Sequence, residues 1–92
     1  MLAECDYKVV DASDNSTTVH TGRCRLYGVQ VTTALSAHAC PIQDGSTVIG
    51  SLAASSAIGT QHQYPGVVCN TSLVVNPDDS ATGILVVYYK VF

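Results

Sequence analysis

The sequence contains few charged residues. Only 12% of its 92 residues are charged, about half of the roughly 25% typical of a soluble domain. The four basic side chains form no run, so we expect no nucleic-acid partner. The longest apolar runs, such as residues 84–89, are far below the roughly 20 residues that cross a bilayer, so we expect no membrane partner.

Signals for export and for catalysis are also missing. The first six residues contain acids where a secretory signal would have a basic segment followed by an apolar stretch, which predicts a chain made in a cytoplasm without a secretory signal. The sequence has no nucleophile elbow, glycine-rich phosphate loop or HExxH pattern. We therefore expect no enzyme activity and no cofactor.

Four cysteines are present, Cys5, Cys24, Cys40 and Cys69, but no two of them form a CxxC pair, so the usual zinc spacing is absent. His38 and Cys40 fall on one face of an expected strand, yet a structural zinc site needs four ligands, and we expect no metal. Two disulfides are formally possible in three pairings. Without a secretory signal, free thiols buried as small core residues are favoured.

The apolar pattern is that of strands. β-branched and aromatic residues form short runs separated by Gly, Pro, Asn and Asp, which predicts an all-β chain folded as a single antiparallel β-sandwich, jelly-roll-like or Ig-like, with little or no helix. We expect one domain, residues 1–92, with residues 1–21 as an N-terminal strand or hairpin arm and residues 22–92 as the core sandwich. The expected strands are residues 5–10, 17–21, 23–33, 36–43, 47–54, 67–69, 72–75 and 84–92.

Glycine and proline predict the local irregularities. Gly28 permits a bulge that exchanges the two faces of its strand, so that Arg23 and Arg25 stay in water while Val29 and Val31 enter the core. Asp44-Gly45 predicts a tight hairpin turn bracketed by Gln43 and Ser46. Pro65-Gly66 predicts a type II turn, and Pro41 an edge or a bulge.

The last strand is apolar on both faces, so a simple surface strand would leave one row of side chains in water. Either the strand is central between two layers or its second face meets another subunit. Leaving that row of apolar side chains in water would lose several kcal/mol of contact energy, at about 25 cal/mol per Å² of buried apolar surface. We therefore expect an oligomer or a larger assembly. The predicted interface residues are Ile84, Val86, Tyr88, Tyr89, Phe92 and Tyr64.

A sugar-binding surface is an alternative use of the aromatic residues. Tyr64, Tyr88, Tyr89 and His62 could form part of one, because aromatic rings stack on the apolar faces of sugars. Nothing in the sequence places these rings on a common face. A core or subunit-interface role is therefore favoured.

The order of motifs between Gly22 and Phe92 carries a resemblance. GRCRLYGV at residues 22–29 is followed by DG at 44–45, PGVVCNTSLVV at 65–75 and ILVVYY at 84–89. This order resembles that of small β-sandwich structural proteins of tailed-phage particles, in which a "G-x-L-x-G-V" strand, a D-G hairpin, a "P-G-V" segment and a "V-V-Y-Y" strand follow one another. The cysteines depart from the usual Thr, Val or Ala. The resemblance covers about three quarters of the chain.

The resemblance implies a head decoration (cement) protein, a fibre or knob module, or a minor tail component, with no catalytic residues. Our first expectation is a capsid decoration protein of the virion, assembled in the host cytoplasm, that forms a homo-trimer or other homo-oligomer and packs on major capsid subunits. The second is a receptor- or carbohydrate-binding module of a fibre or tail. A cellular enzyme or metal-binding protein is the third.

Overall fold

The computed structural model describes residues 5–92 and shows an all-β chain, which confirms the predicted fold class. Residues 1–4, which contribute to the argument about a secretory signal, lie outside the described residues. Eight strands and one short 3-10 helix make up residues 5–92. They are β1 (Asp6–Asp11), η1 (Ala12–Asp14), β2 (Thr17–Thr21), β3 (Cys24–Thr33), β4 (Cys40–Asp44), β5 (Thr47–Leu52), β6 (Gln61–Cys69), β7 (Ser72–Val75) and β8 (Ile84–Val91).

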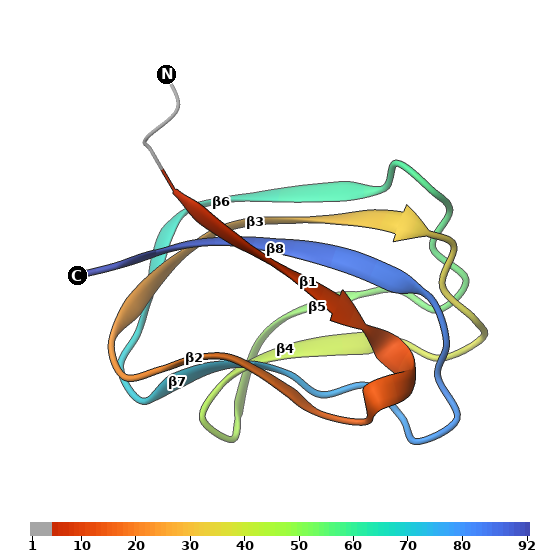
Figure 1. The fold of residues 1–92 in the computed structure, drawn as a ribbon, viewed down its shortest axis with the longest axis horizontal. Helices are drawn as coiled ribbons and strands as arrows, with labels where there is room; N and C mark the ends of the chain where they lie inside the picture. Colours follow the sequence, from red (N-terminus) through yellow and green to blue (C-terminus); the bar gives the residue numbers. More distant parts are fainter. Residues whose placement is uncertain (1–4) are drawn as a thin grey trace.

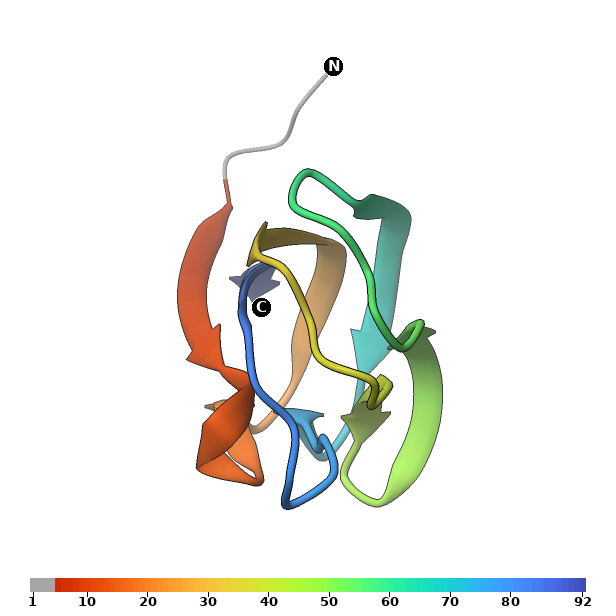
Figure 2. The same ribbon diagram turned by 90° about the vertical axis from the view of Figure 1, so that its right-hand side faces the viewer.

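The strands form two four-stranded sheets packed face to face (Figures 1 and 2). Sheet A has the order β1-β8-β3-β6, and sheet B has the order β2-β7-β4-β5. The antiparallel pairs β1–β8, β2–β7, β3–β6 and β4–β5 are nested one inside the next, as in a long hairpin wrapped around a core. This nesting is that of an eight-stranded jelly roll, so the sandwich is jelly-roll-like rather than Ig-like.

The core lies between the two sheets and is built from the inward row of each strand. Its fully buried side chains are aliphatic residues and cysteines, and no polar or charged residue is buried within the described part of the chain. The largest of them are Leu26, Ile42, Leu52, Leu73 and Leu85. Of the cysteines, Cys24, Cys40 and Cys69 are buried free thiols, while Cys5 is exposed. The burial of three thiols matches the role expected of them as small core residues.

The bulge in β3 is confirmed. Both neighbours of this strand shift register between Leu26 and Gly28: relative to β8, Tyr27 is an additional residue in β3, whereas relative to β6 the additional residues lie in β6. Cys24 and Leu26 point inward before the bulge, and Val29 and Val31 point inward after it, all four with at most 1% of their surface exposed. Because Gly28 has no Cβ, it fits against the carbonyl oxygen of His62, which would lie 3.0 Å from a Cβ. The exchange of faces therefore follows the prediction.

The Asp-Gly hairpin joins β4 to β5, but its turn is one residue later than expected. Asp44 pairs with Thr47, which leaves Gly45 and Ser46 as the central residues, and Gly45 has a positive φ of 62°. A glycine with positive φ at the first central position is typical of a type II′ turn. Asp44 is held in the strand because its carboxylate accepts hydrogen bonds from the backbone of the β6–β7 connection.

The predicted hairpin between the first two strands does not form. β1 pairs only with β8, and β2 pairs only with β7, so the two strands are edges of different sheets. The segment between them contains η1, whose Ala12 is fully buried. Asp11 begins η1 by accepting a hydrogen bond from the backbone of Ser13. Within the segment expected as an N-terminal arm, residues 6–21 thus contribute strands to both layers, because Val10 and Val19 belong to the core.

Two further local predictions are wrong. Pro65-Gly66 does not separate two strands, because β6 continues through it as an edge strand with a bulge opposite Tyr27. An edge strand tolerates the missing proline N–H, and Gly66 takes the positive φ of 86° that the bulge needs. The strand expected from residue 36 begins only at Cys40, because the backbone N–H of Ser36 bonds to Thr82 in another loop.

β8 lies between β1 and β3, so it is central in sheet A. Leu85 and Val87 form its inward row and are fully buried. Ile84, Val86 and Tyr88 alternate with them on the opposite face of the sheet, where they are half-buried. The strand is thus central within its sheet but not between two layers, because its second row is left on the outside of the sandwich.

Candidate functional site

The outer face of sheet A changes from apolar to polar across its four strands. One row of register partners is Tyr7, Tyr88, Gly28 and Gln63, and the next row is Val9, Val86, Gln30 and Gln61. In these two rows, the residues from β1 and β8 are aromatic or aliphatic, and those from β3 and β6 are glycine or glutamine. This face combines a surface suited to apolar contact with a surface suited to hydrogen bonding.

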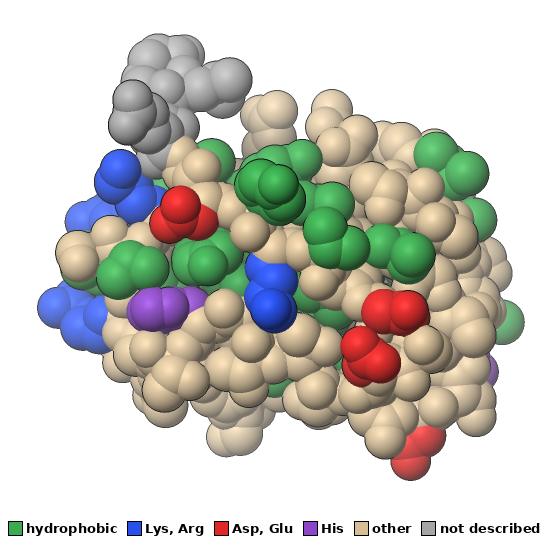
Figure 3. Space-filling model, in the orientation of Figure 1, with side chains coloured by type: hydrophobic (Ala, Val, Ile, Leu, Met, Phe, Trp, Pro, Cys, Tyr) green, Lys and Arg blue, Asp and Glu red, His purple; other side chains and the backbone are tan. Residues whose placement is uncertain are grey.

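We name the first part of this face the apolar patch. It consists of Tyr7, Val9, Ile84, Val86 and Tyr88. Tyr7 is 67% exposed and Val9 is 56% exposed, and both are register partners of β8 residues in the patch. Figure 3 shows hydrophobic side chains gathered over β1 and β8 in the upper part of the view. β1 is an edge strand, so the patch reaches the border of the sheet.

The second part of the face is an open cleft of about 660 Å³ over β3 and β6. Its lining consists of Cys5, Tyr27, Gly28, Val29, Gln30, Gln61, His62, Gln63, Tyr64, Pro65 and Tyr88. The absent side chain of Gly28 leaves room at its floor, and a Cβ there would lie 3.9 Å from the ring of Tyr88. The hydroxyl of Tyr88 lies 3.4 Å from Oε1 of Gln30, to which it donates a hydrogen bond. No Asp, Glu, Lys or Arg lines the cleft.

The structure brings three of the six predicted interface residues together. Ile84, Val86 and Tyr88 lie in the apolar patch. Tyr89 lies on the other face of β8, where it packs against the core and its ring centroid is 5.9 Å from that of His20. The remaining two, Tyr64 and Phe92, lie at other places in the fold.

Phe92 is 55% exposed, but two cations cover its ring. The guanidinium carbon of Arg23 lies 4.5 Å from the ring centroid, and that of Arg25 lies 4.6 Å from it. Cations at this distance are attracted to the negative face of an aromatic ring. The ring therefore already has two interaction partners in its own chain.

Tyr64 connects the two sheets at the edge formed by β6 and β5. Its ring packs against the core, and its hydroxyl oxygen would lie 2.6 Å from a Cβ at Gly50 of β5. Burial raises the pKa of the Tyr64 hydroxyl above its ordinary value. Of the residues considered for a sugar-binding surface, His62, Tyr64 and Tyr88 line the cleft, whereas Tyr89 does not.

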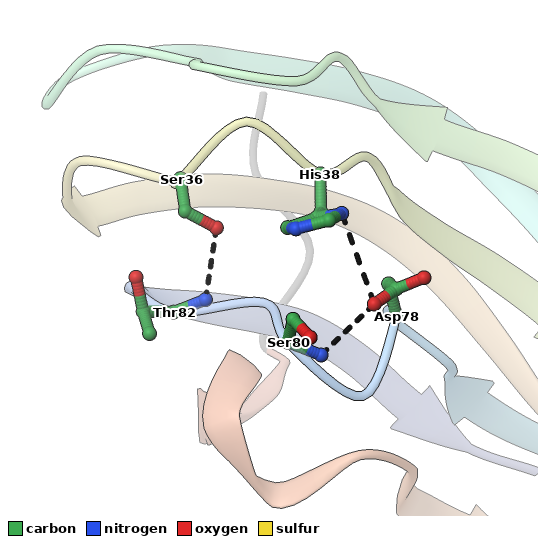
Figure 4. Close-up of polar contacts among 5 residues, drawn as sticks. All are labelled: Ser36, His38, Asp78, Ser80 and Thr82. Carbon is green, nitrogen blue, oxygen red and sulfur yellow. Dashed lines mark hydrogen bonds and ion pairs between the residues drawn. The ribbon is translucent and has the colours of Figure 1, made fainter.

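The proposed metal-ligand pair is not on one strand face, which corrects the expected placement. His38 lies in the loop before β4, with Nδ1 3.8 Å from Oδ1 of Asp78, while Cys40 is fully buried in the core. Figure 4 shows how this loop lies against the loop that precedes β8. Asp78 also accepts a hydrogen bond of 2.9 Å from the backbone of Ser80. In residues 5–92, no three His, Cys, Asp or Glu side chains are grouped so that they could hold a metal ion.

Sequence reasoning missed several residues of this face. Tyr7 and Val9 belong to the apolar patch, and Tyr27, Gln30, Gln61 and Gln63 line the cleft. The alternation of β1 contains a signal for the first two, since Tyr7 and Val9 fall on the face opposite Val10. The glutamines carry no such signal, because their grouping depends on the pairing of β3 with β6, which are far apart in the sequence.

No helix within residues 5–92 has the length and apolar character that would let it span a bilayer. Comparison with known proteins found no family model, curated protein sequence or solved structure that matches the chain.

Proposed function

We propose that the protein is a non-enzymatic structural component that acts by assembly through the apolar patch. The observation that carries this proposal is the contiguity of the patch: Val9 is the register partner of Val86, and Tyr7 is the register partner of Tyr88. Adjacent exposed apolar side chains lose contact with water when a second surface covers them, at a gain of about 25 cal/mol per Å² before the cost of association is subtracted. Assembly is the use to which such a surface is best suited.

The proposed first partner is a second copy of the same chain. The five patch residues carry no charge, so the same patch on another copy meets no like-charge repulsion. Self-association would cover β1 as well, which as an edge strand has unpaired backbone groups. A homo-trimer or another closed homo-oligomer is the form of assembly that we propose.

Within the class of structural proteins, we propose a capsid decoration protein of a tailed-phage head, located in the virion and packed on major capsid subunits. Two observations support this proposal. The order of motifs resembles that of phage structural proteins, and the jelly roll is a fold that viral capsid domains use. A fold alone hosts many functions, so the support comes from the motif order and the patch together.

The test of assembly is the molar mass of the protein in solution across a concentration series, measured by sedimentation velocity. We expect oligomers whose population falls in the variant Val9→Lys, which places a charge in the apolar patch. Val48→Lys is the matched control, because Val48 is 57% exposed on sheet B, outside the patch. A monomer at every concentration, or equal loss of oligomers in both variants, would contradict the proposal.

The virion assignment has its own test, which is the copy number of the chain in purified particles that contain it. A decoration protein is expected at hundreds of copies per particle, in proportion to the major capsid subunits, and quantitative mass spectrometry measures that number. A few copies per particle would favour a fibre or tail component. Absence from particles would contradict the whole virion assignment.

The cleft favours a second candidate function, which is binding of a neutral carbohydrate by a fibre or tail module. The ring of Tyr88 supplies an aromatic surface for a sugar ring, and the amides of Gln61 and Gln63 can both donate and accept hydrogen bonds with hydroxyl groups. The uncharged lining suits a neutral ligand rather than an acidic one. Lectin domains also use the jelly-roll fold.

Two variants separate the two candidates. Gln63→Ala removes a hydrogen-bonding group from the cleft and is expected to weaken glycan binding, measured on an array of neutral glycans, while leaving the oligomer unchanged. Tyr7→Ala removes a patch residue that is absent from the cleft lining. It is expected to weaken the oligomer while leaving glycan binding unchanged. An array with no bound glycan would remove the second candidate and leave the first intact.

A further inference from the structure

Two buried thiols face each other on neighbouring strands. Cys24 at the start of β3 is the antiparallel register partner of Cys69 at the end of β6. Both are fully buried, and each thiol is close enough to influence the pKa of the other. Directly opposed residues of an antiparallel pair have Cα atoms about 4.5 or 5.5 Å apart, and disulfides span Cα separations of about 4.4–6.8 Å. The pair therefore meets the distance requirement for a disulfide with little movement of the backbone.

We propose that Cys24 and Cys69 form an intramolecular disulfide bond when the protein meets an oxidising small-molecule disulfide such as oxidised glutathione. One thiol of the pair loses its proton, and the thiolate attacks a sulfur of glutathione disulfide and releases one glutathione. The second thiolate then attacks the protein sulfur of this mixed disulfide, which forms the Cys24–Cys69 bond and releases the second glutathione. In total, two protein thiols are oxidised and one glutathione disulfide is reduced to two glutathione molecules.

The position of the pair gives the oxidant a route to it. β6 is an edge strand, and the paired residues lie where β3 begins and β6 ends. Strand ends at a sheet edge open locally at less cost than global unfolding. Burial raises the pKa of both thiols, that of Cys69 to about 12, so few thiolates are present at neutral pH. Bond formation is therefore slow and becomes faster as the pH rises.

The other two cysteines have different surroundings and serve as internal controls. Cys40 lies in sheet B, where its register partner is Leu52, and its buried thiol has a raised pKa. Cys5 is exposed before β1. Oxidation is therefore expected to leave Cys40 as a thiol and to attach glutathione to Cys5 or join two copies through it.

The disulfide would connect the edge strand β6 covalently to β3. It would close the loop of residues 24–69, and a cross-link across a loop of this length restricts the unfolded chain strongly. We expect the melting temperature to rise by on the order of 10 °C or more. A chain that is reduced in a cytosol and oxidised outside it would thus become more stable after release.

The experiment uses the variant Cys5→Ser, so that the exposed thiol cannot react. The folded protein is incubated with oxidised glutathione at pH 8.5, its free thiols are alkylated in denaturant, and its peptides are mapped by mass spectrometry. We expect one free thiol, at Cys40, and a peptide pair joined between Cys24 and Cys69. Three free thiols after prolonged incubation, or a bond that includes Cys40, would overturn the proposal.

Further variants test whether the stabilisation comes from the bond itself. In the Cys5→Ser background, adding Cys40→Ala is expected to preserve the rise in melting temperature on oxidation, and adding Cys69→Ala is expected to abolish it. Cys24→Ala replaces Cys69→Ala if the latter does not fold. A rise of equal size in the variant that lacks Cys69 would show that the bond does not cause it. The peptide map needs no substitution in the core, so the proposal can be tested even if both buried variants fail to fold.

Discussion

Asp44, at the end of β4, accepts a hydrogen bond of 2.9 Å from the backbone N–H of Thr71, which lies in the two-residue connection between β6 and β7. The same carboxylate accepts a second bond of 3.0 Å from the N–H of Asn70. This connection carries the chain from sheet A to sheet B. One side chain in the turn region of a hairpin thus holds a crossing between the two layers.

Asp44→Asn is expected to lower the free energy of unfolding by about 1–2 kcal/mol at pH 7, because the amide loses the charge-assisted bonds. The backbone N–H groups of Asn70 and Thr71 lower the pKa of Asp44 in the folded state. A group with a depressed folded pKa stabilises the fold above its unfolded pKa, and this contribution is lost as the pH falls through the folded pKa. Urea unfolding at a series of pH values is therefore expected to show the variant approaching the parent as the pH falls below the ordinary pKa of an aspartate and through the lowered pKa of folded Asp44.

Asp79→Asn is the control for this prediction, because Asp79 is an exposed carboxylate in the loop before β8. It is expected to change the free energy of unfolding by less than about 0.5 kcal/mol. A difference between parent and Asp44→Asn that is the same at pH 2.5 and pH 7 would show that the charge of Asp44 is not what stabilises the crossing.

Ser36 and His38 offer a matched pair in the loop drawn in Figure 4. Oγ of Ser36 accepts a hydrogen bond of 3.0 Å from the backbone N–H of Thr82, whereas Nδ1 of His38 lies 3.8 Å from Oδ1 of Asp78. Ser36→Ala is expected to lower the free energy of unfolding by about 1 kcal/mol, because it removes a hydrogen bond. His38→Ala is expected to lower it by less than about 0.5 kcal/mol, because surface ion pairs contribute little. Chemical denaturation measures both. Equal costs would mean that the Ser36 bond does not fix the loop.

Gly50 and Tyr64 are expected to be coupled. Gly50→Ala would place a Cβ 2.6 Å from the Tyr64 hydroxyl oxygen and is expected to destabilise the fold by about 1–3 kcal/mol. Tyr64→Phe removes that oxygen, so the cost of Gly50→Ala is expected to be smaller by at least about 0.5 kcal/mol in the Tyr64→Phe background. A double-mutant cycle measured by thermal or urea unfolding tests this. Strict additivity would mean that the ring of Tyr64 does not occupy this position.

Phe92 is expected to stabilise the fold through its two arginines. Phe92→Leu keeps an apolar side chain but loses the ring beneath the guanidinium groups, at an expected cost of about 0.5–1 kcal/mol. In a background with Arg23→Gln and Arg25→Gln, the same substitution is expected to cost almost nothing. Urea unfolding of the four proteins measures the difference. An equal cost in both backgrounds would assign the effect to apolar contact alone.

Local features of the fold could be predicted because local residues determine them. Gly28 indicated the exchange of faces in β3, and Asp44-Gly45 indicated the hairpin. Both signals depend on backbone conformations that few residues adopt. The alternation of β8 indicated a strand with two apolar rows, of which one lies in the core and the other in the apolar patch.

Pairing between distant strands could not be predicted. The segments of β1 and β2 look like a hairpin in the sequence, but each finds a better partner near the other end of the chain. Pro65-Gly66 is a strong turn signal, yet an edge strand accommodates the same residues as a bulge. The cleft was missed for the same reason, because Gln30 and Gln61 become neighbours only when β3 pairs with β6.

The placement of β8 constrains the order of folding. β1 and β3 are not neighbours, and both need β8 between them before sheet A exists. β8 follows the other seven described strands in the sequence, so during synthesis β1 must wait for the strand with which it pairs until residues 84–91 have been made. Contacts between segments so far apart in the sequence form slowly. A chain that stops before residue 84 would therefore leave two open strand edges and an uncovered core, and we expect it to aggregate rather than to form a smaller sandwich.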